Sequence, residues 1–465
     1  MEKESCAKAA EKYRDDDAPD TAEQEKVKAV LLVGKCVLRE TGNATTLDRL
    51  GRTVNDAGWE CVMRDPDSLA DCSSLPALVK QHNIVVALGI HAYRSAPVLL
   101  ACQELGVPYV VMFGGTDVNE CVREAAKKDV MSLVVAGARS LVAFQTATRD
   151  TVLQIWPSLN RDKIWVLPQA VQVNPDPDFD VLSYLESVEA AHVATTTSRG
   201  EQETRKTSVS DRDAEMESGP VERKEKTVTE GNRINKNSSL RENGMSRESK
   251  GVSAQNICSE TLINDISQNQ QHKKLPGTLE PLPDVFNPLV LLVAGLRPVK
   301  DVLYLAEAWS EWQKARRGRG RFLIIGPTLD PQYTVHVHAQ VHRLSGVRVC
   351  PTLAPSECQA LMSSATVLVN SSRSESMSSA ILEAMALGTP VLAKDIPGNA
   401  SLITHGQTGL LYASPDAFLQ GLNSLLQDSQ LQKGLVTAAR DHVARFHSLQ
   451  QEKKLLLCIL QQAML

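Results

Sequence analysis

The sequence has few aromatic residues, no closely paired cysteines, no long apolar run and no excess of basic charge. Its 465 residues carry 50 Lys and Arg against 55 Asp and Glu, and the net charge of −5 argues against a nucleic-acid partner. The 10 cysteines form no C-x-x-C pair, so neither a disulfide framework nor a zinc site is expected. No apolar run approaches the roughly 18 residues of a membrane span, so no transmembrane segment is expected.

The N-terminal residues 1–26 form a highly charged tail that does not resemble a signal peptide. Cysteines scattered through apolar segments are typical of a reducing compartment, so a cytoplasmic location is expected. Secretion remains the alternative, because Asn-x-Ser/Thr triplets occur at Asn43, Asn237, Asn370 and Asn399.

Apolar segments typical of buried parallel strands alternate with helical segments in two parts of the chain. This pattern predicts an α/β protein with two Rossmann-like, doubly wound domains, at 27–185 and 287–446, which face each other across a cleft. A C-terminal helix is expected over 447–465.

The segment 186–286 separates the two predicted domains. It contains no Phe, Trp or Tyr before Phe286, is rich in Ser, Thr, Glu, Lys and Arg, and lacks periodicity. Such a composition cannot bury enough apolar surface to offset the loss of chain entropy, so the segment is expected to be a disordered linker. A regulatory segment that is phosphorylated is the alternative.

The stretch "SESMSSAILEAMALGTPVL" carries Glu383 among apolar residues and Glu375 eight positions before it. If both residues were helical they would stand about 12 Å apart, farther than the roughly 5–9.5 Å of paired glycosidase carboxylates. Alternatively, Glu375 ends a loop, and the free amides at the start of the helix form an anion site between the two carboxylates. The residues alone also allow a helix capped by Ser378 or Ser379, with Glu383 in solvent.

The same stretch resembles the E-x7-E signature of the group 1 (family 4) retaining glycosyltransferases, which have the GT-B fold. The resemblance continues through "THGQTGLLY". The segments "MFGGTDVNE", "AGLRPVKDVLYL" and "AKDIPGNAS" are similar, more closely, to the glycosyltransferase 1 domain-containing protein 1 family. The resemblance covers both predicted domains but neither the N-terminal tail nor the linker.

The resemblance implies a role for each residue of this region. Glu383 would bind the ribose hydroxyls of a nucleoside-diphosphate sugar, and Glu375 would contact the donor sugar. The backbone amides of Met377, Ser378 and Ser379 would take phosphate oxygens. Transfer would proceed with retention of configuration and without a protein nucleophile.

In the loop after the first strand of the second domain, the resemblance implies that Arg297 and Lys300 neutralise the donor diphosphate. Fixed cations beside a leaving group that gains negative charge lower the barrier of the reaction. An ordinary solvated loop pair is the alternative.

In the first domain, the resemblance implies an acceptor side at Gly42, Asn43, His91, Gly115 and Asp117. Each has a structural alternative. Gly42 and Asn43 are common turn residues, a lone histidine is often structural, and Asp117 alternatively caps a helix.

The histidines at 336, 338 and 342 have no carboxylate or cysteine partner at ligand spacing, so no metal and no cofactor is expected. No G-x-G-x-x-G follows either first strand, which disfavours a dehydrogenase. The interpretation is a hexosyltransferase that moves a sugar from a nucleoside-diphosphate sugar to an unknown acceptor. The alternative is a catalytically silent sensor or scaffold. It is favoured by two departures from the family, Ser376-Met377-Ser378 in place of glycines and Gln169-Ala170 in place of Asn-Gly.

Overall fold

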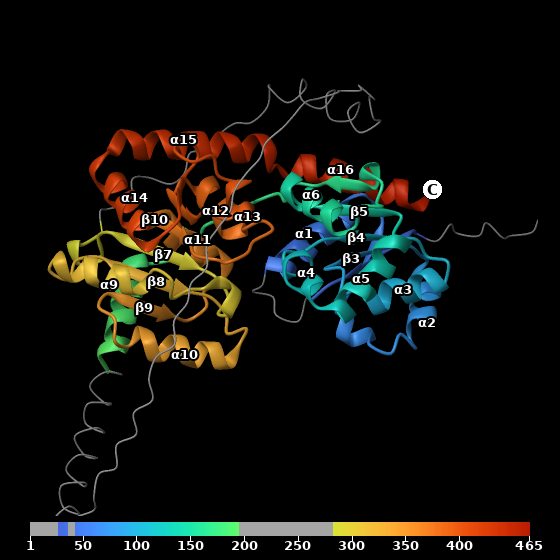
Figure 1. Cartoon of the computed structure of the whole chain (residues 1–465), viewed down its shortest axis with the longest axis horizontal. Coiled ribbons are helices and arrows are strands. Elements are labelled where there is room, and N and C mark those ends of the chain that lie inside the picture. Colours follow the sequence, from blue (N-terminus) through green and yellow to red (C-terminus); the bar gives the residue numbers. More distant parts are fainter. Residues whose placement is uncertain (1–26, 36–41, 195–281) are drawn as a thin grey trace, which may run out of the picture.

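Two parallel sheets of six strands form the centres of two lobes in the computed structural model, which describes residues 27–35, 42–194 and 282–465 (Figure 1). All strand pairs within both sheets are parallel. The expected class of two Rossmann-like α/β domains is therefore confirmed. The expected tail at 1–26 lies outside the described residues.

The N-terminal lobe contains a sheet in the order β2-β1-β3-β4-β5-β6. Its elements are β1 (Ala29–Val33), α1 (Gly42–Asp56), β2 (Glu60–Arg64), η1 (Pro66–Leu69), α2 (Leu75–His82), β3 (Ile84–Ile90), α3 (Ala96–Glu104), β4 (Tyr109–Met112), α4 (Thr116–Asn119), η2 (Cys121–Arg123), α5 (Ala125–Gly137), β5 (Ser140–Ala143), α6 (Thr146–Ile155), η3 (Arg161–Lys163) and β6 (Ile164–Val166).

The C-terminal lobe contains a sheet in the order β12-β11-β10-β7-β8-β9. Its elements are η4 (Asp284–Phe286), β7 (Leu289–Val293), η5 (Pro298–Lys300), α9 (Ala306–Ala315), β8 (Arg321–Ile325), α10 (Pro331–Val341), β9 (Val347–Cys350), α11 (Pro355–Ser364), β10 (Val367–Asn370), α12 (Ser379–Leu387), β11 (Val391–Lys394), α13 (Pro397–Ala400), β12 (Leu410–Tyr412), α14 (Pro415–Gln427) and α15 (Ser429–Phe446). The last helix, α16, spans Leu449–Met464.

Two segments leave one lobe and pack on the other. Residues 181–194 are helical and follow the N-terminal sheet, yet Leu185 lies in the hydrophobic core of the C-terminal lobe. In return, α16 crosses back, and its Leu456, Ile459 and Leu460 pack against the N-terminal sheet (Figure 1). The expected linker of 186–286 therefore overlaps ordered structure at both ends, over 186–194 and 282–286, while 195–281 lies outside the described residues.

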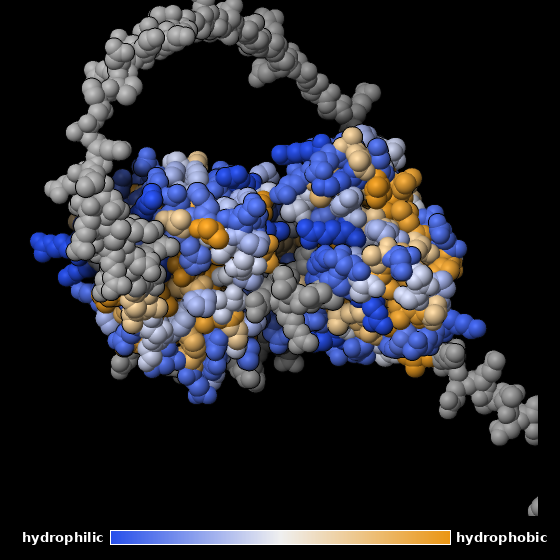
Figure 2. Space-filling view, turned by 90° about the horizontal axis from the view of Figure 1, so that it is seen from below, coloured by the Kyte–Doolittle hydropathy of each residue, from blue (hydrophilic) through white to orange (hydrophobic). Residues whose placement is uncertain are grey.

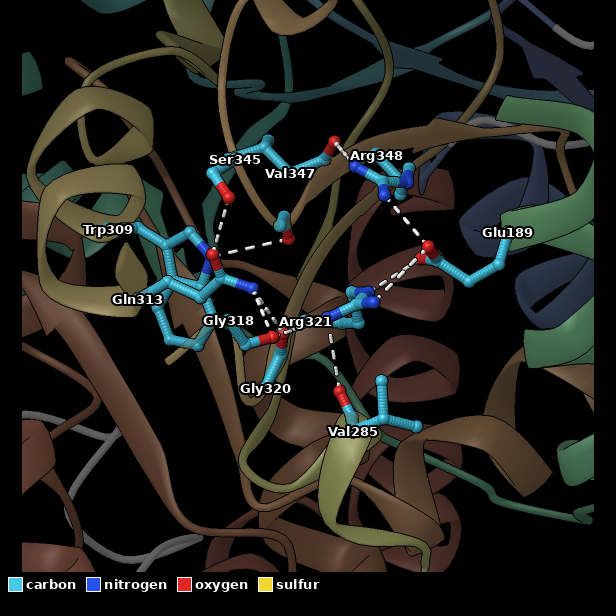
Figure 3. Close-up of polar contacts among 11 residues, drawn as sticks. Glu189, Val285, Trp309, Gln313, Gly318, Gly320, Arg321, Ser345, Val347 and Arg348 are labelled. Carbon is cyan, nitrogen blue, oxygen red and sulfur yellow. Dashed lines mark hydrogen bonds and ion pairs between the residues drawn. The ribbon is translucent and has the colours of Figure 1, made fainter. Parts of the chain in front are cut away.

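An ion cluster fixes the helix of residues 181–194 to the C-terminal lobe (Figure 3). Glu189 accepts hydrogen bonds from Arg321 Nε at 2.7 Å and from Arg348 Nη2 at 2.8 Å. Burial alone would raise the pKa of Glu189, but the two arginines outweigh it and lower the pKa. Arg321 Nη1 also donates to Val285 O at 3.1 Å. One arginine thus joins the chain on both sides of residues 195–281.

A second buried ion pair holds α16 on the N-terminal lobe. Glu452 accepts from Arg49 Nε at 2.6 Å and Arg49 Nη2 at 3.0 Å. Glu452 Oε1 also accepts the amide of Ala170 at 3.0 Å, at the point where the chain leaves the first sheet. The side chain of Glu452 is only 1% exposed, so water cannot replace these contacts.

We expect Glu452→Ala to lower the free energy of unfolding by about 3 kcal/mol, because it leaves the Arg49 charge buried without a partner. Urea denaturation followed by circular dichroism measures this loss. The neighbouring Lys453, whose pair with Asp56 is exposed, supplies a matched control. Lys453→Ala should change stability by less than about 0.5 kcal/mol, and equal losses in the two variants would contradict the role given to Glu452.

Candidate functional site

The residues expected to bind the donor lie where the strand order of the C-terminal sheet reverses. β7 and β10 are neighbours, although 73 residues separate Val293 from Val367 on the chain. Arg297 and Lys300 follow β7, and Glu375 follows β10, so the two loops leave the same edge of the sheet. Open α/β sheets bind ligands at this edge, outside the carboxyl ends of the strands.

Glu375 is held through one of its two carboxylate oxygens. Oε1 accepts from Lys300 Nζ at 2.6 Å, Ser372 Oγ at 2.7 Å and Asn370 Nδ2 at 3.2 Å. Burial would raise the pKa of Glu375, but the charge of Lys300 and these hydrogen bonds outweigh it and lower the pKa. Glu375 is therefore ionised at neutral pH. Within the described chain Oε2 makes no hydrogen bond, and Glu375 lines a cavity.

Glu375 lies in the loop that precedes α12, so the prediction of a loop carboxylate rather than a helical pair is confirmed. Ser378 is the N-cap, and its Oγ accepts the amide of Ile381 at 3.5 Å. Gly388 ends the helix with a left-handed φ of 85°. No acceptor among the described residues pairs with the amides of Ser379 or Ala380. The start of α12 thus keeps free donors beside Glu375, and Met377 packs against the cores of both lobes.

Glu383 lies one turn into α12 and is partly buried. Burial raises its pKa, and one hydrogen bond from Gln359 Nε2 to Oε2, at 3.2 Å, acts in the opposite direction. Gln359 also accepts the amide of Asn174 at 2.7 Å. Gln359 therefore joins Glu383 to the segment that connects the lobes. The carboxylate of Glu383 is therefore not freely exposed to solvent.

Arg297 faces the opposite lobe from the loop after β7. Its Nε is buried and has no hydrogen-bond partner among the described residues. Burial lowers the pKa of Arg297, Glu375 raises it, and the nearby Arg94 of the N-terminal lobe lowers it further. A buried guanidinium with an unused donor is costly unless a ligand supplies the acceptor.

A cavity of about 660 Å³ opens between the lobes. The C-terminal wall consists of residues that follow β7, β10 and β11. The N-terminal wall consists of Arg94 in the loop after β3, residues of α4 and η2, and the start of α5. The lining residues are Arg94, Thr116, Asn119, Glu120, Cys121, Arg123, Glu124, Lys127, Arg297, Pro298, Val299, Arg373, Ser374, Glu375, Ile396, Pro397 and Gly398. In the view from below, blue, hydrophilic residues lie on both lobes near their boundary, with some hydrophobic residues among them (Figure 2).

His91 lies at the end of β3 but behind the cavity wall, with 2% of its surface exposed. Its Nε2 is 3.0 Å from Thr116 Oγ1, and its Nδ1 accepts the amide of Arg94 at 3.3 Å. Burial lowers the pKa of His91, so the ring is neutral at pH 7. Since Nδ1 is the acceptor, Nε2 carries the proton and donates a hydrogen bond to Oγ1 of Thr116, which lines the cavity. His91 thus orients a wall residue.

Asp117 is fully buried and is not the N-cap proposed as its structural alternative, because Gly115 occupies that position. The carboxylate accepts the amides of Ala92 at 3.0 Å and Gly114 at 2.9 Å, and it does not line the cavity. By taking these amides, Asp117 fixes two loops together. Residues 116–123 form the short helices α4 and η2, and the longer helix α5 begins at Ala125.

Gly115 meets the other lobe directly. A Cβ atom on Gly115 would stand 3.1 Å from the amide nitrogen of Ser376, so a larger residue would push the lobes apart. Gln145 Nε2 donates to Gly398 O at 3.3 Å across the same boundary. Gly42 and Asn43 begin α1, after residues 36–41, which lie outside the described part. The backbone carbonyl of Gln169 lies 2.8 Å from His447 Nδ1, where the chain crosses between the lobes.

Sequence reasoning missed the residues that hold the carboxylates and the wall opposite them. Asn370 and Ser372 hold Glu375, Gln359 holds Glu383, and Arg94 and Arg123 face the donor side. Only Asn370 and Ser372 gave a usable signal, since polar residues that directly follow a buried strand often face a ligand. Among the described residues no group of three or more His, Cys, Asp or Glu is arranged to hold a metal ion.

A family model described as glycosyl transferases group 1 matches residues 287–428, which contain Arg297, Lys300, Glu375 and Glu383. Residues 287–428 are a glycosyl transferase group 1 domain. The chain is also 29% identical over 418 residues to Glycosyltransferase 1 domain-containing protein 1 of Xenopus tropicalis, covering 90% of this chain and 93% of that protein. The resemblance indicated by the sequence is confirmed.

Other relatives match a smaller part of this chain. D-inositol 3-phosphate glycosyltransferase of Acidothermus cellulolyticus is 30% identical over 168 residues, 34% of this chain and 38% of the relative. Two solved structures share the fold over 94% of this chain. Sucrose-phosphate synthase of Thermosynechococcus elongatus has a TM-score of 0.63 at 14% identity and 98% coverage of that chain. Anabaena HepE in complex with UDP and glucose has a TM-score of 0.60 at 13% identity and 99% coverage. The fold is GT-B.

No helix in the described part of the chain is long and apolar enough to cross a membrane.

Proposed function

We propose that this protein transfers a hexose from a nucleoside-diphosphate sugar to an acceptor bound between the lobes, with retention of configuration. The nucleotide sugar binds mainly to the C-terminal lobe. Glu383 accepts the ribose hydroxyls, and the free amides at the start of α12 take phosphate oxygens. UDP is the first nucleotide to test, because HepE was solved in complex with UDP-glucose.

The observation that supports this proposal is that only one of the two carboxylate oxygens of Glu375 accepts hydrogen bonds. Three donors fix Oε1, while Oε2 has no partner among the described residues, and Glu375 lines the cavity. A carboxylate fixed in this way is ready to accept a sugar hydroxyl without reorganisation. Lys300, fixed by the same contact, supplies a positive charge that would stabilise a departing diphosphate.

The reaction exchanges one bond at the anomeric carbon. The bond from this carbon to the diphosphate oxygen breaks, and its electron pair leaves with the diphosphate. An acceptor oxygen forms the new bond, and its proton passes to a diphosphate oxygen. Lys300 and Arg297 stabilise the charge on the leaving group. Because this charge is larger in the transition state than in the bound donor, they stabilise the transition state more and lower the barrier. Neither a protein nucleophile nor a metal ion has a part in this scheme.

The same proposal includes a reducing, cytoplasmic location. Cys61, Cys72, Cys102, Cys121, Cys350 and Cys358 are free thiols. Burial raises the pKa of Cys102 to about 12, which keeps this thiol protonated and unreactive.

Calorimetry of the full chain with UDP, GDP and their hexose conjugates tests donor binding, and mass spectrometry tests turnover. We expect one nucleotide to bind at micromolar concentration and its hexose conjugate to be consumed with release of the nucleoside diphosphate. The anomeric proton coupling of the product, measured by NMR, reports retention. Binding without any turnover would favour the sensor or scaffold, and no binding of any nucleotide would exclude both functions.

A further inference from the structure

The N-terminal wall of the cavity carries more positive charge than its own acidic residues neutralise. Its cations are Arg94, Arg123 and Lys127, and its acids are Glu120 and Glu124. Lys127 donates to Glu124 at 2.6 Å, so these two charges neutralise each other. Arg94 and Arg123 then face a single acid, Glu120. Neither arginine has an ion pair within the described chain.

The C-terminal wall does not supply the missing negative charge. Arg373 pairs with Asp301 at 3.1 Å, and Glu375 pairs with Lys300 at 2.6 Å. Arg297 therefore remains a third cation without an ion pair, and its buried Nε has no acceptor in the described residues. Three guanidinium groups without an ion pair therefore border one cavity, and Glu120 is the only acid of the described cavity lining that is not already in an ion pair.

The two walls meet closely enough for these cations to influence each other. The charge of Arg94 acts on Arg297 across the cavity and lowers its pKa, as repulsion between two cations requires. Arg94 lies three residues after His91, and its amide donates to the His91 ring at 3.3 Å. The backbone that presents this arginine is therefore rigid. A fixed, uncompensated pair of cations on opposite walls favours an anion between them.

The donor diphosphate accounts for only part of this charge. Under the proposed function, on which this inference rests, Lys300, Arg297 and the start of α12 take the diphosphate, and all of them belong to the C-terminal lobe. Arg94 and Arg123 belong to the other lobe, on the side where the acceptor enters. Thr116 and Asn119 lie beside them on the same wall and offer neutral hydrogen-bonding groups suited to hydroxyls.

We propose that the acceptor is a hydroxyl compound that carries an anionic group, a phosphate monoester or a carboxylate, bound by Arg94 and Arg123. Guanidinium groups bind both anions through paired hydrogen bonds. The anionic group fixes one end of the acceptor, while Thr116 and Asn119 orient its hydroxyls toward the donor sugar. A neutral sugar would leave the two arginines unpaired.

The test compares three probes on the full-length protein: glucose, glucose 6-phosphate and glucuronate. Each is titrated by calorimetry, with and without saturating UDP. We expect at least one anionic probe to bind the UDP-bound protein at least about tenfold more tightly than glucose. One charge-assisted hydrogen bond is sufficient for a tenfold difference in Kd. The probe that binds more tightly distinguishes phosphate from carboxylate. The preference should decrease at high salt.

The variant Arg94→Gln/Arg123→Gln should lose at least about tenfold in affinity for that anionic probe and keep its affinity for UDP. Arg139→Gln, an exposed arginine of the same lobe outside the cavity, is the matched control and should change neither. Equal affinities for glucose and both anions, or an unaffected double variant, would overturn the proposal. So would a loss of UDP affinity as large as the loss of anion affinity, because the arginines would then serve the donor.

Failure of the proposed function has a different signature. If the wild-type protein binds no nucleotide, the donor assignment is wrong, and the titrations without UDP still measure whether the wall prefers anions.

Discussion

Lys300→Gln is expected to lower kcat by about a hundredfold to a thousandfold, with a smaller change in the Kd for the nucleotide. Lys300 stabilises charge that develops on the leaving diphosphate, and the loss of such a donor affects the transition state more than the bound substrate. Release of nucleoside diphosphate from the donor that the wild type consumes measures kcat, and calorimetry measures Kd. The exposed Lys314→Gln in the same lobe should have wild-type kinetics.

The same substitution has a consequence for stability, because it leaves Glu375 buried without its cation. In the wild type the lowered pKa of Glu375 contributes stability above the ordinary glutamate pKa, and this contribution disappears as pH falls through the lowered value. Lys300→Gln should therefore be least stable relative to wild type near pH 7, with a smaller deficit in acid. Lys300→Gln/Glu375→Gln should recover stability without activity. If the double variant also recovers kcat, Lys300 has only a structural role.

Glu383→Ala is expected to raise the Kd for UDP about a hundredfold, because two charge-assisted hydrogen bonds to the ribose would be lost, about 3 kcal/mol together. Glu383→Gln keeps an acceptor oxygen and should lose about tenfold. Calorimetry measures both, and the exposed Glu311→Ala on α9 is the matched control. An unchanged Kd in Glu383→Ala would refute the assignment of the ribose site.

The raised pKa of Glu383 gives this prediction a second, independent readout. Since burial raises the pKa, the ionised form is costly in the free protein, and this cost grows as pH rises above the ordinary glutamate pKa. Neutral replacements should therefore leave the nucleotide-free protein at least as stable as wild type at pH 7. In the wild type, affinity for UDP should decrease as pH falls through the raised pKa. In Glu383→Gln this pH dependence should be absent.

Local patterns in the sequence were sufficient for the parts of the site that lie on single elements. From "SESMSSAILEAMALG" alone, a loop position for Glu375 and a helix capped by Ser378 or Ser379 were among the alternatives considered. The structure has Ser378 as the N-cap and Gly388 as the C-cap. The contacts of Asp117 were not predictable in this way. Its partners, Ala92 and Gly114, lie on two different loops, so sequence spacing suggested an ordinary helix cap instead.

The amino-acid sequence by itself determined the two α/β repeats, the absence of a long apolar span and the E-x7-E stretch, because hydrophobic periodicity and capping act over a few neighbouring residues. Only the tertiary structure decided that β7 lies beside β10, which brings Lys300 to Glu375. It also decided that the helix of residues 181–194 and α16 each pack on the other lobe, and that Arg94 and Arg123 face Arg297. These arrangements depend on packing between segments far apart in the chain, and no local pattern encodes which buried surfaces will meet.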